Sequence, residues 1–224
     1  MDPIPWLVEL LLRTDLRRTF RRICWVGDWP PSLPDGPIIA YCNHTHYYDG
    51  HLGWLLFQDR LDRSATLWMA EWQRFPFFGA VGAQPFPRDD AGERAATLRR
   101  TARRFHNNPE TVLIYYPEGE LHASAEGIRS FAPSATRRLG RLYPQATWWP
   151  FAIRVTWDGE AHPTAYLAGG PGHAADGKER ARLSTLLNSL SPDAGSVRTL
   201  MEGRRSQSER WDFSFAAPFF ERYL

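Results

Sequence analysis

The chain has 224 residues, of which 43% are hydrophobic and 14% aromatic, enough for one sizeable folded domain and not typical of a disordered tail. The formal net charge of +2 gives no field strong enough to predict a nucleic acid partner. Cys24 and Cys42 are too few for a disulfide scaffold and lack metal-ligand spacing, so we interpret them as reduced, buried thiols. Because there is no apolar run of about 18 residues and no secretory leader pattern, we expect a cytoplasmic protein without a spanning helix.

The first 22 residues predict an amphipathic helix. Apolar residues recur every four positions on one face: Val8, Leu12, Leu16 and Phe20. A parallel stripe on another face is charged: Glu9, Arg13, Arg17 and Arg21. Further apolar residues widen the apolar side: Trp6, Leu7, Leu10 and Leu11. Such a helix either packs on its own domain or lies in a membrane interface with its arginines facing anionic headgroups. We assign residues 1–26 to this arm, 27–36 to a Pro/Gly-rich linker and 37–224 to the main domain.

From residue 37 the chain alternates between strand-like and helix-like patterns. Short apolar runs predict strands at 37–42, 65–70, 111–117 and 146–155, and weaker edge strands at 164–169 and 211–218. Periodic segments predict helices at 51–61, from the acidic pair at 89–90, around 134–142 and near 183–190. Strands separated by helices imply parallel connections, so the predicted fold is one α/β domain with a mainly parallel sheet flanked by helices.

A cluster of polar side chains follows the first of these strands. In a parallel α/β sheet, ligands bind beyond the carboxyl ends of the strands, and the sequence "NHTHYYD" at 43–49 lies at such an end. If the loop folds back, Asp49 accepts a hydrogen bond from one nitrogen of His44. The other nitrogen is then free to take a proton from a substrate hydroxyl, which is the arrangement of a general base.

The same stretch supports a metal-dependent hydrolase as an alternative, with the four side chains of His44, His46, Asp49 and His51 as ligands. The aspartate and the last histidine are separated by one glycine, and the remaining histidines (His106, His122, His162 and His173) fall in settings that do not suggest further ligands. His46 is only three residues from Asp49 and is the main rival of His44 for the role of base.

Four sequence blocks occur in an order that resembles the glycerolipid acyltransferase family, the lysophosphatidic acid acyltransferase-like enzymes. "NHTHYYD" resembles the family's N-H-x4-D block, and "GAQPFPR" at 82–88 its second block, which ends in an arginine. "YYPEGE" at 115–120 resembles F-P-E-G-T-R, and "WWPFAI" at 148–153 resembles the apolar fourth block with its proline. "SFAPSATRRL" at 130–139 also looks like the family's F-K-x-G-A stretch. The resemblance covers about residues 37–156.

The resemblance implies O-acyl transfer from an acyl thioester, acyl-CoA or acyl carrier protein, to a hydroxyl of a lysophospholipid or another lipid alcohol. It makes His44 the base and Asp49 the residue that orients it, without a metal or other cofactor. Arg88 would hold a phosphate by bidentate hydrogen bonds, and Glu118 and Gly119 would position the acceptor. Secondary candidates from the same blocks are Asn43, His46, Phe86, Pro117 and Pro150.

Two departures from the family pattern affect the expected acceptor. Glu120 and Leu121 stand where the family has Thr and Arg. A second phosphate-holding arginine is therefore missing from its usual position, and a carboxylate stands next to that position. Arg129 or Arg154 would have to compensate. Because of this change, the acceptor is expected to be something other than lysophosphatidic acid: another lysolipid, an amino-acid lipid or a neutral alcohol such as a glycosylated isoprenoid. A non-catalytic lipid-binding relative whose third block has decayed is the remaining alternative.

The resemblance also bears on location. Substrate and product of such an enzyme dissolve in a bilayer, which favours the membrane-interface reading of the N-terminal helix and a peripheral position on the cytoplasmic face. Trp25 and Trp29 would suit the headgroup zone.

Overall fold

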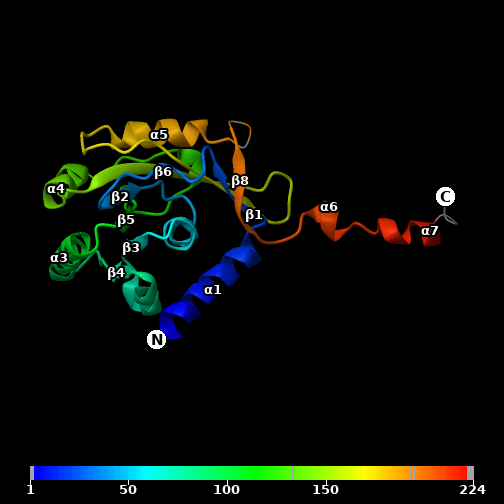
Figure 1. Ribbon diagram of the computed structural model, residues 1–224, viewed down its shortest axis with the longest axis horizontal. Helices are drawn as coiled ribbons and strands as arrows, with labels where there is room; N and C mark the ends of the chain where they lie inside the picture. Colours follow the sequence, from blue (N-terminus) through cyan, green and yellow to red (C-terminus); the bar gives the residue numbers. More distant parts are fainter. Residues whose placement is uncertain (1–2, 133, 192, 194, 221–224) are drawn as a thin grey trace.

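The computed structural model describes residues 3–132, 134–191, 193 and 195–220, and its strands form a single eight-stranded sheet in the order β4-β3-β5-β2-β6-β7-β1-β8 (Figure 1). The five strands from β4 to β6 run parallel, whereas the β6–β7 and β1–β8 pairs are antiparallel. This confirms the predicted α/β domain with a mainly parallel sheet. The strands are β1 (Arg22–Val26), β2 (Ile38–Tyr41), β3 (Ser64–Met69), β4 (Ala83–Pro85), β5 (Thr111–Tyr115), β6 (Thr147–Thr156), β7 (Thr164–Gly169) and β8 (Val197–Glu202).

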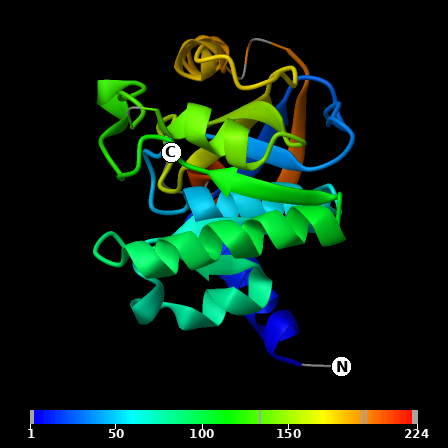
Figure 2. The ribbon, with the colours of Figure 1, turned by 90° about the vertical axis from the view of Figure 1, so that its left-hand side faces the viewer.

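Helices cover both faces of the sheet, and each face has its own apolar core. On one face, the core lies between the sheet and α1, α2 and the π-helix that continues α2. On the other face, the core lies between the sheet and α3, α4 and α5. Figure 2 shows α3 and α4 in front of the strands. The helices are α1 (Pro3–Thr19), α2 (Asp49–Trp54), α3 (Ala91–Asn107), α4 (Ala135–Leu142), α5 (Glu179–Ser189), α6 (Gln207–Arg210) and α7 (Ala217–Phe220), with the π-helix η1 (Leu55–Arg60) and the 3-10 helices η2 (Trp72–Arg74), η3 (Pro76–Val81), η4 (Ser124–Glu126) and η5 (Ser214–Ala216).

Strand β2 is central and buried on both sides, which explains its unbroken apolar sequence. Ile38 and Ala40 belong to the core under α1 and α2, whereas Ile39 and Tyr41 belong to the core under α3, α4 and α5. This alternation is the period of two that a strand imposes. The predicted strands at 37–42, 65–70, 111–117 and 146–155 and the four predicted helices are all confirmed. Asp90 caps α3 as its spacing indicated, because its side chain accepts a hydrogen bond from the backbone of Glu93 (2.9 Å).

Helix α1 uses two different faces. Its predicted stripe of Val8, Leu12, Leu16 and the adjacent Phe20 is buried in the core. The widened apolar side is exposed: Trp6, Leu7, Leu10 and Leu11. The arginines of the charged stripe do not simply face outward, because Arg13 bonds to Asp59 (2.6 Å) and Arg21 pairs with Glu160 (3.5 Å).

The segment after α1 differs from the arm and linker that we expected. Residues Arg22–Val26 form β1, which pairs with β7 on one side and β8 on the other, so they belong to the sheet. Trp25 is therefore buried and stacks on Trp149 (ring centroids 6.3 Å apart), and it is not placed to reach a membrane. Trp29 packs partly buried against the same core. The apolar run of this strand has only four residues, 23–26, and directly follows a helix, so it has no recognisable period of its own. The sequence pattern therefore did not separate it from the arm.

Two predicted edge strands are also corrected. β7 is real but lies inside the sheet, between β6 and β1. The segment at 211–218 is not a strand: it contains the 3-10 helix η5 and the start of α7, and Figure 1 shows this C-terminal part extending away from the sheet. The strand that borders β1 is β8 instead. The alternating Trp211, Phe213 and Phe215 fitted a strand pattern, but their side chains are exposed and no sheet edge is available to them at β1.

Candidate active site

The parallel register brings three distant sequence blocks together. Tyr41 at the end of β2 pairs with Tyr115 at the end of β5, Leu67 of β3 pairs with Ile114 of β5, and Met69 pairs with Pro85 at the end of β4. The loops that follow β2, β5 and β4 therefore leave the same edge of the sheet. These loops carry the residues around His44, Glu118 and Arg88, respectively.

His44 and Asp49 form the central pair. Nδ1 of His44 lies 3.1 Å from Oδ2 of Asp49, and because a carboxylate only accepts, Nδ1 is the donor. The same oxygen accepts hydrogen bonds from the backbone N–H groups of Thr45 and His46 (2.9 Å each), which folds the loop back onto the first residue of α2. The Asp49 side chain is fully buried and that of His44 is 25% exposed. The carboxylate thus fixes the tautomer and leaves Nε2 for a substrate.

The ring of His44 also rests on an aromatic platform. It stacks on Tyr116, the residue after β5, with ring centroids 4.4 Å apart and planes 24° apart. Burial raises the pKa of Tyr116 well above its ordinary value, so this phenol stays neutral at physiological pH. The platform restricts ring rotation in addition to the Asp49 hydrogen bond.

His46 and His51 have other contacts, although His51 also lines the cavity described below. The backbone N–H of Tyr48 donates to Nδ1 of His46 (3.3 Å), whose ring packs near Phe20, and burial lowers the pKa of His46. Nε2 of His51 faces Asp15 at 4.0 Å, and burial lowers its pKa to about 4. Among the residues that the structure describes, the ligand atoms of the predicted metal cluster do not converge. The geometry favours His44 over His46 as the base and gives no support to the metal alternative.

Glu118 plays a different part from the acceptor contact that we predicted. Its side chain is fully buried and does not line the cavity described below. One oxygen accepts from the backbone N–H of His44 (2.9 Å), and the other from Nε2 of His122 (2.7 Å) and the backbone N–H of Arg129 (2.5 Å). The backbone N–H of His122 in turn donates to the carbonyl of His44 (3.2 Å). Residues 118–122 therefore hold the backbone of His44 on both sides.

The secondary candidates are structural neighbours of this pair. Asn43 is buried and joins β2 to β6, because its amide exchanges two hydrogen bonds with the backbone of Ile153 (2.9 Å each). Pro150 lies opposite Tyr41 in the β2–β6 register, inside the sheet. Phe86 stacks on Trp68 (4.6 Å) at the end of β4. Pro117 is buried at the end of β5.

Arg88 reaches the site but is already paired. Its Nη1 lies 2.6 Å from Oε1 of Glu120, and Nη2 donates to the carbonyl of Gly119 (3.4 Å). The two compensating arginines that the sequence offered are engaged elsewhere. Arg129 pairs with Glu126 (2.7 Å), and Arg154 donates to the carbonyl of Leu187 (2.7 Å).

A cavity of about 470 Å³ opens beside His44, within the size range of small-ligand sites. Leu12 of α1 and the aromatic Phe78 form part of its wall, and Arg88, Gly119 and Glu120 lie at its polar end. Most of the other lining side chains are apolar, namely Tyr47, Trp54, Leu67, Trp68, Met69, Ala70, Phe75, Val81, Tyr116 and Leu121. Such a lining suits a hydrocarbon chain next to one reacting polar group.

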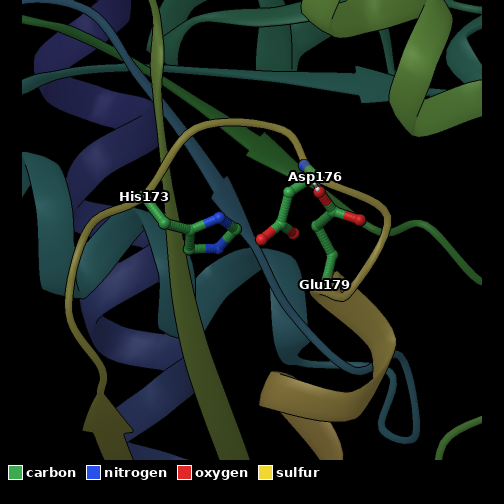
Figure 3. A group of neighbouring side chains, drawn as sticks. All are labelled: His173, Asp176 and Glu179. Carbon is green, nitrogen blue, oxygen red and sulfur yellow. Dashed lines mark hydrogen bonds between the residues drawn. The ribbon is translucent and has the colours of Figure 1, made fainter.

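A second group of polar side chains lies on the opposite face of the sheet. His173, Asp176 and Glu179 gather near the start of α5 (Figure 3). Their polar atoms are taken up by the protein: Tyr41 bonds to Nε2 of His173 (2.8 Å), and Arg182 bonds to both oxygens of Asp176 (2.6 and 2.7 Å). One oxygen of Glu179 accepts two backbone hydrogen bonds at the turn before α5. The contacts explain this group as a structural support of the turn.

Sequence reasoning missed His122 and Tyr116 as site residues. Both fall in or beside the third block, but the block predicts only Pro117, Glu118 and Gly119 as functional. The only signal for His122 was its position, four residues after Glu118. In a loop without a regular period, this spacing does not distinguish a buried histidine from an exposed one.

The comparison with protein families agrees with this geometry. The model of the Acyltransferase family matches residues 26–154, more than half of the chain, so the protein belongs to the acyltransferase family. The matched region begins at the end of β1 and ends within β6, and it includes His44, Asp49, Arg88 and Glu118. Comparison with curated proteins gives no match. The protein is an acyltransferase whose catalytic domain carries the site described above.

Proposed function

We propose that the protein is an O-acyltransferase that moves a fatty acyl group from acyl-CoA or acyl carrier protein to a hydroxyl of a lysophospholipid or another lipid alcohol. The observation that carries the proposal is the His44–Asp49 pair at the wall of a largely apolar cavity. A general base beside a hydrocarbon-lined space fits an acceptor with one hydroxyl and a long chain.

The reaction follows from the free nitrogen of His44. Nε2 takes the proton of the acceptor hydroxyl while the alcohol oxygen attacks the thioester carbonyl, and Asp49 stabilises the resulting imidazolium. The tetrahedral intermediate collapses with cleavage of the C–S bond, and the leaving thiolate takes the proton from Nε2. The ester and the free thiol are the products, and His44 returns to its starting state. The proposal requires no cofactor beyond the acyl donor.

The position of α1 supports a peripheral location at a membrane surface, which we propose to be the cytoplasmic face. Leu12 lines the cavity from one face of α1, while Trp6 and Leu11 on its other side are 62% and 54% exposed. Docking of that exposed side in a bilayer interface would bring the cavity close to the lipid acceptor. In the described part of the chain, the helices are all too short or too polar to cross a bilayer.

The test is acceptor-dependent release of free thiol from acyl-CoA in the presence of a panel of lysolipids and lipid alcohols. His44→Ala is expected to lower the rate at least about 100-fold, the usual contribution of a positioned base. His46→Ala is the matched control, because His46 belongs to the same loop but does not line the cavity, and it should retain most of the activity. Circular dichroism verifies that both variants fold.

Full activity of His44→Ala would refute the assigned base. A wild-type protein that binds these lipids but releases no thiol with any acceptor would instead indicate a non-catalytic lipid-binding relative.

A further inference from the structure

The arginine at the polar end of the cavity carries an internal counter-ion. Arg88 and Glu120 face the cavity together with His44, and their side chains meet at 2.6 Å. They are 66% and 56% exposed, so the pair is open to whatever enters the cavity. The Arg88 guanidinium, which would bind a phosphate, is thus already paired with the Glu120 carboxylate of the same site.

The charges of the cavity cancel. Besides Arg88 and Glu120, the carboxylate and guanidinium side chains that line it among the described residues are Glu71 and Arg74, which pair with each other at 2.7 Å. Two imidazoles line it as well: that of His44, the proposed base, and that of His51, whose pKa is lowered by burial to about 4. Two cations and two anions leave no net positive charge for a phosphomonoester. A phosphomonoester carries between one and two negative charges at neutral pH. To bind, it must displace Glu120 from Arg88 and then lie beside that carboxylate.

In the part of the chain that the structure describes, the two arginines that the sequence offered as compensation do not relieve this conflict. Arg129 follows the loop of Glu120 but pairs with Glu126, and Arg154 caps a carbonyl of α5. Neither residue lines the cavity. By contrast, an uncharged hydroxyl needs no displacement, since it can donate to Glu120 or accept from Arg88 while the ion pair stays intact.

We propose that Glu120 is a specificity-determining residue that keeps Arg88 in an internal ion pair and directs the enzyme to uncharged lipid alcohols, against phosphomonoester lysolipids. The inference rests on the proposed function, because it assigns the class of acceptor that His44 deprotonates. Glu120 selects the acceptor; it does not take part in the proton transfer.

The experiment compares two acceptors that differ in the phosphate alone: a monoacylglycerol and the lysophosphatidic acid with the same acyl chain. For each, kcat/KM is measured by thiol release from one acyl-CoA with the full chain. The wild type should favour the monoacylglycerol at least tenfold. Glu120→Gln keeps the size of the side chain but removes its charge, and should shift the ratio about tenfold toward lysophosphatidic acid, the effect of one partly solvated like charge.

Two variants make this result specific. Adding Arg88→Gln to Glu120→Gln should cancel the shift, because the gain depends on a freed guanidinium. Glu126→Gln is the matched control: it also neutralises a half-exposed carboxylate paired with an arginine, but outside the cavity, and the ratio should stay unchanged.

A wild type that favours lysophosphatidic acid, or a Glu120→Gln variant with an unchanged ratio, would overturn the inference. If the wild type releases thiol with neither of these acceptors nor with any other of the panel, the proposed function fails, and equilibrium binding still decides the inference. Trp54 and Trp68 line the cavity, so quenching of tryptophan fluorescence measures the affinity for each lipid. Glu120→Gln must then tighten lysophosphatidic acid relative to monoacylglycerol, and equal affinity ratios in both proteins would refute the role of Glu120.

Discussion

Replacing His122 with alanine tests whether the loop after β5 holds His44, the proposed base, in place. The side chains of His122 and Glu118 are both fully buried and 2.7 Å apart. The variant leaves the Glu118 carboxylate buried with its two backbone donors, from His44 and Arg129, but without the imidazole. Loss of one partner of a buried carboxylate costs about 3 kcal/mol of unfolding free energy. A typical total of about 5–15 kcal/mol leaves the variant folded at room temperature.

The catalytic consequence follows from the backbone contacts of His44. Its N–H donates to Glu118, and its carbonyl accepts from the N–H of His122. If the loop loosens, the imidazole is held less accurately, and a displacement of about 1 Å lowers turnover by about 100-fold. We therefore expect His122→Ala to lower kcat with a smaller change in KM, because the lining of the cavity is retained.

His122→Gln separates position from packing, since its amide nitrogen lies near the place of Nε2 and can still donate to Glu118. It should recover most of the stability and much of kcat, with a residual loss of about 1 kcal/mol. His173→Ala is the matched control. The ring of His122 is held at both nitrogens, by Glu118 and by the carbonyl of Ala123 (3.1 Å). The ring of His173 is held in the same way, by Tyr41 (2.8 Å) and the carbonyl of Ala174 (2.7 Å), but on the opposite face of the sheet.

Urea unfolding gives the stability of each variant, and thiol release gives kcat and KM. His173→Ala should lose stability with kcat within about twofold of the wild type. Two results would refute the reasoning: unfolding free energy and kcat of His122→Ala both close to wild type, or a kcat for His122→Gln as low as that for the alanine variant.

Two further predictions concern pH and the membrane. Burial lowers the pKa of His51 from 6.5 to about 4, so this residue adds stability that is fully present above pH 6.5 and is lost as the pH falls toward 4. His51→Gln should reduce the loss of unfolding free energy over this pH range by about 3 kcal/mol. Urea unfolding at a series of pH values measures this loss, and the same pH dependence in both proteins would contradict the lowered pKa of His51. Trp6→Ser with Leu11→Ser should lower co-sedimentation with anionic vesicles without loss of stability, because both side chains are exposed. Leu142→Ser, at an exposed position of α4, is the control, and equal binding by all three proteins would return α1 to a purely structural role.

The membrane test uses substitutions because truncation of the N-terminal arm is not interpretable. Deleting residues 1–26 would remove Leu16 and Phe20 from the core and β1 from the centre of the β7–β1–β8 group. The sequence pattern correctly predicted the helix and its apolar stripe, because a repeat of four over three turns is a strong signal, and the structure shows that this stripe is buried in the core. It did not predict β1, because the partners of a short strand lie far away in the sequence. β7 and β8 begin at Thr164 and Val197.

In the site, too, features with a local sequence pattern could be predicted, whereas contacts between distant segments could not. The central strands and the polar residues after them could be predicted, since parallel strands must bring their carboxyl ends to one edge. The hydrogen bond between His44 and Asp49 was expected from a loop that folds back, and the structure shows it. The pairing of Arg88 with Glu120, 32 positions apart, depends on how two loops leave that edge, and no local pattern encodes it. For the same reason the sequence suggested a substrate contact for Glu118, whereas its side chain is buried.

Three consecutive residues connect the proposed base with the proposed selection of the acceptor. Glu118 turns inward and holds the backbone of His44, the carbonyl of Gly119 accepts from Arg88, and Glu120 turns outward to pair with the same arginine. Gly119 has a φ of +77°, in the left-handed region that favours glycine, and this turn lets its two neighbours face opposite ways. Because the Glu118 contacts are buried and the Glu120 contact is exposed, the charge at position 120 can change without disturbing the base. The expected consequence is that acceptor preference and kcat respond to different residues of one loop, Glu120 for the first and Glu118 with His122 for the second.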